Sequence, residues 1–189
     1  MSKRPANPNL DLRGRRRGTT IEDGTLLVAN RSGSATGSGP VSVTSGKLTG
    51  NGIIAGATTI GTGSGTGAFL APGGMNVSST LKIQSALIFN ADATYSYTFK
   101  SNSRGIRADM LVANGITINS EATVALSGQT TGALTQGAVL TLIRNTSADP
   151  ISGTFSNLPD GAIVNVNGNN LQASYEGGDG NDLTLTVVP

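Results

Sequence analysis

The sequence predicts an all-β protein whose main body is a parallel β-solenoid. Short apolar segments, such as Leu26-Leu27-Val28 and Ile53-Ile54, recur between turn residues throughout residues 24–74. No segment keeps the 3.6-residue period of an amphipathic helix, whereas alternation with period two is frequent. The chain of 189 residues is 37% hydrophobic and 4% aromatic and holds 27 glycines, which suits a narrow core of Val, Ile, Leu and Ala.

The first residues differ in charge from the rest of the chain. Residues 1–18 hold six of the 13 Lys and Arg residues but one of the 11 acidic residues, and they carry little apolar surface. We expect residues 1–20 to be a basic tail, flexible or docked on a partner, and residues 21–189 to be the β-solenoid domain. The arginines of the tail are candidate self-association residues, namely Arg13, Arg15, Arg16 and Arg17.

Other roles for this tail remain open. A solvated tail is one alternative, and an electrostatic contact with nucleic acid or an anionic membrane is another. The tail has no aromatic side chain on which a base could stack, so we expect no nucleic-acid partner.

From about Ile21 onward, period-two alternation predicts a succession of short strands. Residues of the types Thr, Ser, Asn, Lys and Gln lie between the apolar positions, and Gly-rich turns separate the strands. The alternating positions are Val41/Val43, Leu81/Ile83, Tyr95/Tyr97/Phe99, Ile116/Ile118, Val124/Leu126, Leu140/Leu142, Val164/Val166 and Leu183/Leu185/Val187. We expect inward side chains at Val43, Ile60, Leu126, Leu142, Val166 and Leu185.

A loose repeat supports the solenoid prediction. Four apolar residues follow turns at separations of 15, 17 and 17 residues, namely Val28, Val43, Ile60 and Val77. The second half has longer strands and more aromatic residues, so it forms either a wider solenoid or an antiparallel C-terminal cap. The alternative architecture is an antiparallel sandwich joined by Asn-Gly and Asp-Gly hairpins.

The chain lacks several residue types on which chemistry depends. It has no Cys and no His, which excludes thiolate metal sites and every nucleophile paired with a histidine. No apolar run is long enough to span a bilayer. The N-terminus has no apolar segment behind its basic residues, so we expect export after removal of a signal or by another route.

Several sequence blocks resemble, in order, the autotransporter-associated β-strand repeat of bacterial surface and secreted proteins. The blocks are GTLLVANRSGSATGSGPVSVTSGKLTGNGIIAG, FLAPGG, ADMLVANG, ISGTFSNLPDGAIV and SYEGGDGNDLTLT, which together cover roughly residues 24–188. The resemblance implies a right-handed parallel β-helix displayed outside the cell, and it carries no catalytic residue. The ending Val187-Val188-Pro189 is similar to the point where such chains continue into a Pro-Glu-Pro sorting signal.

Two glycine-rich segments suggest ligand sites. Gly177–Leu183 starts like the nonapeptide that binds Ca²⁺ in β-rolls, but it occurs once and its apolar residue is one place early, so we expect a turn and no metal site. Gly63–Ala68 matches a dinucleotide-binding pattern. Because Pro72, Gly73 and Gly74 follow it instead of a helix, we expect no cofactor there.

Two further groups could act on carbohydrate. Arg104, Arg107 and Asp109 lie close in sequence, but the acids of the chain are scattered singly, so we expect a structural turn and no catalytic residue. The stripe Tyr95/Tyr97/Phe99 could stack on sugars, but we expect it to form one buried face together with Phe89.

The sequence thus predicts a non-enzymatic extracellular structural protein, a scaffold or a subunit of a surface fibre or adhesive assembly. A glycan-binding module and a polysaccharide-active β-helix enzyme are the alternatives. The patterned segments Thr25–Asn30 and Leu183–Val188 would leave unpaired strand edges at the two ends of the domain. We therefore expect a homo-oligomer or a filament formed by end-to-end stacking, with surface glycans as the other candidate partner.

Overall fold

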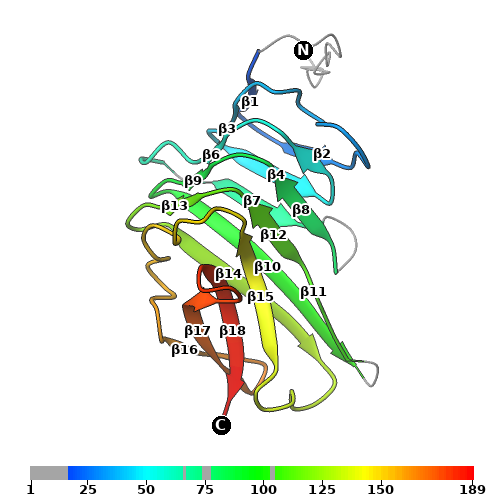
Figure 1. The fold of residues 1–189 in the computed structure, drawn as a ribbon, viewed down its shortest axis with the longest axis vertical. Helices are drawn as coiled ribbons and strands as arrows, with labels where there is room; N and C mark the ends of the chain where they lie inside the picture. Colours follow the sequence, from blue (N-terminus) through cyan, green and yellow to red (C-terminus); the bar gives the residue numbers. More distant parts are fainter. Residues whose placement is uncertain (1–16, 66, 74–77, 103–104) are drawn as a thin grey trace, which may run out of the picture.

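The computed structural model describes residues 17–65, 67–73, 78–102 and 105–189. These residues form an all-β structure with three largely parallel sheets and no helix, which confirms the predicted fold class at this level. Figure 1 shows the strands lying one below another along the long axis of the molecule. β1 and β2 lie near the N-terminal end of this axis, and β16–β18 lie near the C-terminal end.

Each sheet collects strands that are far apart in the sequence. Sheet A contains, in spatial order, β1 (Thr19–Ile21), β3 (Val41–Val43), β6 (Thr58–Ile60), β9 (Leu87–Phe89) and β13 (Ile116–Ile118). Sheet B contains β2 (Thr25–Val28), β4 (Gly46–Gly50), β7 (Ala68–Pro72), β10 (Ala93–Asn102) and β14 (Thr123–Thr130), with β11 (Gly105–Ala108) antiparallel to β10. Sheet C contains β5 (Ile53–Ile54), β8 (Thr80–Ile83), β12 (Met110–Ala113), β15 (Val139–Asn145), β18 (Asp182–Val188), β17 (Asn169–Gly177) and β16 (Ile163–Val166).

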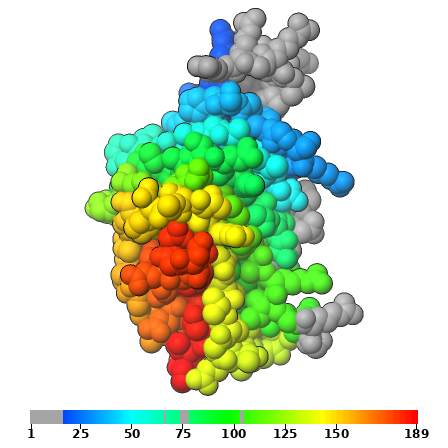
Figure 2. Space-filling model, viewed as in Figure 1, coloured from blue at the N-terminus to red at the C-terminus, as the bar shows by residue number. Residues whose placement is uncertain are grey.

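The chain visits sheets A, B and C in turn, and we call one such passage a circuit. β3, β4 and β5 make one circuit, and β6, β7 and β8 make the next. Strands of successive circuits pair in parallel register. Figure 2 shows the same progression on the surface, where the colours follow chain order from the N-terminal end toward the other end.

The repeat predicted from apolar anchors holds for Val43 and Ile60, which are 17 residues apart in one column, and is wrong for Val28. The residues that share one column of sheet A are Ile21, Val43, Ile60, Phe89 and Ile118, separated by 22, 17, 29 and 29 residues. Val28 lies in sheet B instead, and Val77 lies outside the described residues. The circuits differ in length because backbone pairing fixes the strands, whereas the loops between sheets accept insertions.

The C-terminal strands pair antiparallel, unlike most of the other strands. β18 pairs antiparallel with both β15 and β17, and β17 pairs antiparallel with β16. Leu183–Val188 is therefore an interior strand, and the prediction that it forms an unpaired end is wrong. The chain turns back on itself here, and short hairpins join antiparallel neighbours without a crossover.

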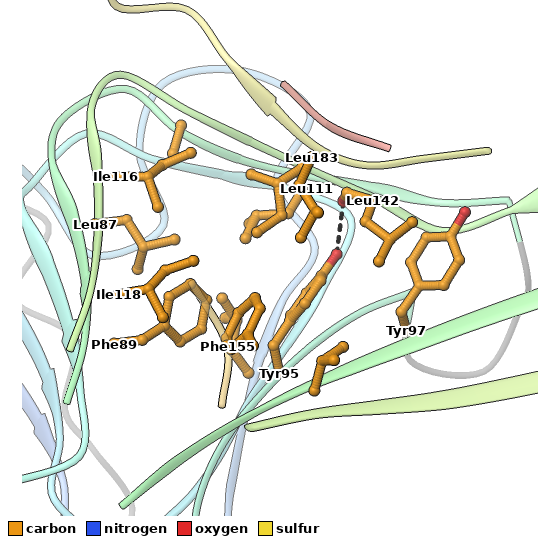
Figure 3. Packing of buried hydrophobic residues seen from close by; sticks show 14 of the residues in the cluster. Leu87, Phe89, Tyr95, Tyr97, Leu111, Ile116, Ile118, Leu142, Phe155 and Leu183 are labelled. Carbon is orange, nitrogen blue, oxygen red and sulfur yellow. Dashed lines mark hydrogen bonds between the residues drawn. The ribbon is translucent and has the colours of Figure 1, made fainter. Parts of the chain in front are cut away.

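The predicted aromatic stripe is buried. Tyr95, Tyr97 and Phe99 are each 0% exposed, so the sugar-stacking alternative is wrong for these rings. Figure 3 shows Tyr95 beside Phe89 and Phe155, and the ring centroids of Phe89 and Phe155 lie 5.3 Å apart. The Tyr95 hydroxyl donates a hydrogen bond of 2.7 Å to the Leu142 carbonyl oxygen, which satisfies its polar end inside the core.

The inward faces agree with the alternation in the sequence. Four of the six expected positions are fully buried, namely Val43, Ile60, Leu142 and Leu185. Leu126 and Val166 point the same way but are only partly buried against the core.

Truncation of an inward leucine should cost far more stability than truncation of an outward residue. Leu142 is 0% exposed, whereas Ile163 is 59% exposed. We expect Leu142→Ala to lower the free energy of unfolding by about 2–5 kcal/mol, because it removes buried apolar contacts and leaves a cavity. Ile163→Ala is the control and should change it by less than roughly 0.5 kcal/mol. Equal effects in urea denaturation would mean that the assigned faces are reversed.

Candidate functional site

The structure separates the residues of the predicted Arg-Asp cluster. Asp109, between β11 and β12, is 4% exposed, and its Oδ1 accepts a hydrogen bond of 3.1 Å from the Ser79 amide. Arg107 is exposed on β11, and no ion pair joins it to Asp109 among the described residues. Arg104 lies outside the described residues. Asp109 therefore fastens the segment before β8 to the following circuit.

Asp109 also borders a recess of about 300 Å³, lined in part by Thr80, Ile106, Val139 and Thr141. Burial raises the pKa of Asp109, and hydrogen bonds from the Ser79 and Ser78 amides oppose this rise. A single carboxyl group already engaged by backbone amides does not provide the two separated acids that glycoside hydrolysis requires. Among the described residues, no group of three or more His, Cys, Asp or Glu side chains could hold a metal ion.

The glycine-rich segment at Gly63 is held by a carboxylate of the chain itself. Asp92 accepts hydrogen bonds from the Gly63 amide at 2.7 Å and from the Thr62 amide at 3.1 Å. Burial would raise the pKa of Asp92, but these hydrogen bonds outweigh it, so the pKa is lowered. The strand β7 follows instead of a helix, so this part of the described chain has no helix N-terminus that could bind a phosphate.

Gly177–Leu183 forms the turn between β17 and β18, as the sequence predicts. Gly178 and Gly180 have φ angles of +63° and +106°, which an L side chain rarely adopts. Asp182 Oδ1 accepts a hydrogen bond of 2.8 Å from the Asn145 amide on β15. Burial raises the pKa of Asp182, opposed by the hydrogen bond from Asn145.

These carboxylates share a structural pattern with several asparagines that sequence reasoning did not single out. Asn30 accepts from the Ile53 amide, Asn145 from the Gly115 amide, and Asn157 from the Val124 amide. Each bond joins a loop or strand end to a neighbouring circuit. The signal in the sequence was the frequent Asn or Asp near a turn, and it gave no indication of the distant partner.

The strands at the N-terminal end have one unpaired side among the described residues. β1 pairs only with β3, and β2 pairs only with β4. The Thr19 amide and the Ile21 carbonyl oxygen are bonded toward the β3 side. Because successive residues of a strand direct their backbone groups to opposite sides, Thr20 faces the open side. In β2, the carbonyl oxygens of Gly24 and Val28 accept hydrogen bonds from the Lys47 and Asn51 amides. By the same alternation, the backbone groups of Thr25 and Leu27 face the open side.

The third sheet is closed at this end. The Ile53 amide of β5 donates to Asn30 Oδ1 at 2.9 Å, and the Ile53 carbonyl oxygen accepts from the Ala35 amide at 3.0 Å. The Ala55 amide donates to the Ser34 hydroxyl at 3.0 Å. The loop that contains Asn30, Ser34 and Ala35 therefore satisfies the edge of sheet C, and only β1 and β2 remain open. We call the outer sides of β1 and β2 the N-terminal edge.

The C-terminal end is covered in part, because β13, β14 and β16 each pair with a strand on one side, and some positions of β13 and β14 are occupied on the other. In sheet A, Ser152 bridges Thr117 and exchanges backbone hydrogen bonds with Ile116 and Ile118. In sheet B, the Asn157 side chain accepts from the Val124 amide and donates to the Val124 carbonyl oxygen. In sheet C, β18, β17 and β16 continue beyond β15. The two ends of the described structure are therefore unlike.

The N-terminal edge is short, polar on its outer face and acidic at its corner. Thr20, Thr25 and Leu27 are exposed, and Leu27 is 56% exposed. The exposed acids Glu22 and Asp23 lie in the corner between β1 and β2. Such an edge can accept an added strand through backbone hydrogen bonds, and its charges restrict which strand fits.

Three of the four arginines proposed for self-association lie outside the described residues. Arg13, Arg15 and Arg16 are not among the described residues. Arg17 is exposed just before β1. Its carbonyl oxygen leaves no room for a side chain at Gly39, so the backbones of these two residues are in close contact. Sheet A begins at Thr19, two residues inside the segment assigned to the tail.

Comparison of the chain with protein-family models, curated proteins and solved structures gave no match. No helix of the described residues is long and apolar enough to cross a membrane.

Calcium should leave the stability of the protein unchanged. Asp182 in the Gly177–Leu183 turn already accepts a backbone amide, and a Ca²⁺ ion needs six or more oxygen ligands. Thermal melts in calcium and in chelator should coincide, for the wild-type chain and for Asp179→Asn alike. A calcium-dependent rise in Tm that Asp179→Asn abolishes would contradict this.

Neutralising Asp109 should increase stability more at neutral pH than in acid. Its native pKa is raised above 3.8, so its stabilising contribution is complete below that value and is lost as the pH rises through the native pKa. Asp109→Asn keeps an oxygen for the Ser79 amide and removes the buried charge. Its gain in unfolding free energy over the wild type, measured in urea, should therefore be larger at about pH 7 than at about pH 3.

Asp92→Asn is the matched control for this pH dependence. The native pKa of Asp92 is lowered, so its contribution is present above 3.8 and is lost as the pH falls through the native pKa. Asp92→Asn should therefore lose stability relative to the wild type at neutral pH, with the difference shrinking in acid. Two variants that behave alike would show that these environments are not distinct.

Proposed function

We propose that residues 19–189 form a right-handed parallel β-solenoid that serves as a non-enzymatic structural scaffold outside the cell. The repeated order of sheets A, B and C, with parallel pairing between circuits, supports the solenoid. The right hand is supported by the resemblance of the sequence blocks and by the strong preference of parallel crossovers for that hand. The antiparallel strands β16–β18 serve as its C-terminal cap.

One observation carries the structural role. The carboxylates that could perform chemistry accept backbone amides from neighbouring circuits instead, as Asp92, Asp109 and Asp182 do. Groups used in this way stabilise loops, and their scattered positions do not form an acid pair for glycoside cleavage. The geometry therefore favours a scaffold over a polysaccharide-active enzyme.

The outer faces also suit a solvated scaffold. In sheet A, Thr20, Ser42, Thr59 and Thr117 lie in one outward column, interrupted by Ile88. Phe69 is the exposed aromatic residue of the described chain, so the stacked rings of a typical glycan-binding face are not present there. Hydroxyl ladders of this kind keep a sheet surface hydrated and can contact glycans through hydrogen bonds.

A direct experiment separates the scaffold from the enzyme. The purified full chain should release no reducing ends from a panel of plant and bacterial polysaccharides above the level of a heat-inactivated sample. Activity that Asp109→Asn abolishes would overturn the scaffold and establish the enzyme. For the location, antibodies should label intact producing cells without permeabilisation; labelling only after permeabilisation would overturn the extracellular role.

Residues 1–18 should contribute to self-association. They carry six basic residues and directly precede β1, the first strand of the N-terminal edge. Deleting residues 1–18 should therefore change the assembly state measured by light scattering. If the full chain and the deleted chain scatter alike at every concentration, the tail has no part in assembly.

A further inference from the structure

The two ends of the described structure differ in a way that limits how copies can join. Among the described residues, β1 and β2 of the N-terminal edge are open, whereas at the C-terminal end Ser152 bridges Thr117 of β13 and Asn157 binds Val124 of β14. Head-to-tail stacking on sheets A and B would have to displace Ser152 and Asn157 before β13 and β14 could pair along their whole length. Contact between two like N-terminal ends needs no such change, and a contact between like surfaces closes after two copies.

We infer that the N-terminal edge binds the same edge of a second copy of this chain and forms a two-fold symmetric dimer. This rests on the proposed solenoid, because it requires β1, β2 and the 29–40 segment to lie on three sides of one end circuit. A two-fold axis that passes through the corner between sheets A and B exchanges these sheets. Each β1 then lies against β2 of the partner subunit, running antiparallel to it.

The alternation of backbone N–H and C=O groups along β1 and β2 supports this pairing and limits its register. Thr20 faces the open side from β1, and Thr25 and Leu27 face it from β2, so one of these two must oppose Thr20. The two-fold axis lies at the corner, and all three residues of β1 must lie opposite residues of the partner's β2. These two conditions place Thr20 opposite Leu27 of the partner subunit. Ile21 then lies opposite the partner's Leu26.

This register matches inward with inward and outward with outward side chains. Ile21 packs into the core and Leu26 is partly buried against it, so the two join into one continuous apolar layer. Leu27, which is 56% exposed, becomes covered beside Thr20. Both strands gain the backbone hydrogen bonds that the edge lacks, as in strand addition to a sheet.

The corner acids set the strength of the contact. Glu22 and Asp23 of both copies come together around the two-fold axis, and juxtaposed like charges weaken association. With two short strand pairs, we expect a weak dimer. Its affinity should rise with salt, which screens these charges, and should rise roughly tenfold in the double variant Glu22→Gln, Asp23→Asn.

Sedimentation velocity of the full 189-residue chain over a range of micromolar concentrations tests the dimer. We expect a monomer–dimer equilibrium that stops at two copies. Leu27→Lys should abolish the dimer by placing a charge at the edge, whereas Ile163→Lys should leave it unchanged. The two positions are matched, because Leu27 is 56% exposed and Ile163 is 59% exposed. Equal effects of the two variants would overturn the inference.

Cysteine cross-linking tests the register, and the chain offers no background because it contains no Cys. A mixture of Thr20→Cys and Leu27→Cys should oxidise to a heterodimer, since opposed residues lie within disulfide reach. Each variant alone, and Thr20→Cys mixed with Ile163→Cys, should not cross-link. Preferential linkage of Thr20→Cys to Thr25→Cys would overturn the register.

These outcomes separate the dimer from the scaffold function. A chain that stays monomeric at the highest concentration, or that grows into filaments, overturns the dimer and leaves the scaffold proposal standing. Polysaccharide cleavage would overturn the scaffold and leave the sedimentation result unaffected.

Discussion

Every parallel strand of this protein depends on the neighbouring circuits for its backbone hydrogen bonds. β4, for example, pairs with β2 on one side and β7 on the other, and these strands lie about 20 residues away in each direction. A strand in the middle of the stack is therefore satisfied, and a strand at its end is not. The remaining features of the fold follow from how each end and each corner meets this requirement.

Asparagine and aspartate side chains form hydrogen bonds with backbone groups that have no partner strand. Asp92 binds the Gly63 amide, Asn30 binds the Ile53 amide, and Asn157 binds both backbone groups of Val124. These positions give short polar side chains a structural use in a protein without histidine or cysteine. The same contacts orient these carboxylates, because each accepts one or more backbone amides.

The core changes character along the axis. Its N-terminal part is filled by aliphatic residues such as Ile21, Val28 and Val43, whereas Phe89, Tyr95, Tyr97 and Phe155 fill the part below. The larger rings accompany the longer strands β10 and β14, and the antiparallel strands close the wider section. The narrow end has no comparable cover on sheets A and B. The two ends therefore differ both in core composition and in the strands that lie beyond the core.

The sequence by itself determined the all-β class, the absence of helix from the described residues and the inward face of most strands. These depend on local alternation, and Val43, Ile60, Leu142 and Leu185 are buried as that alternation predicts. The turn within Gly177–Leu183 could also be predicted from the sequence, because glycine favours the positive φ angles that this turn adopts. Tertiary structure alone decided the circuit lengths, the burial of Asp109 beside Ser79, and the interior place of β18. The circuits depend on partners 17–29 residues away, Asp109 on a partner 30 residues away, and the pairing of β15 with β18 on residues 40 or more apart. Side-chain alternation carries no information about which distant strand a backbone will meet.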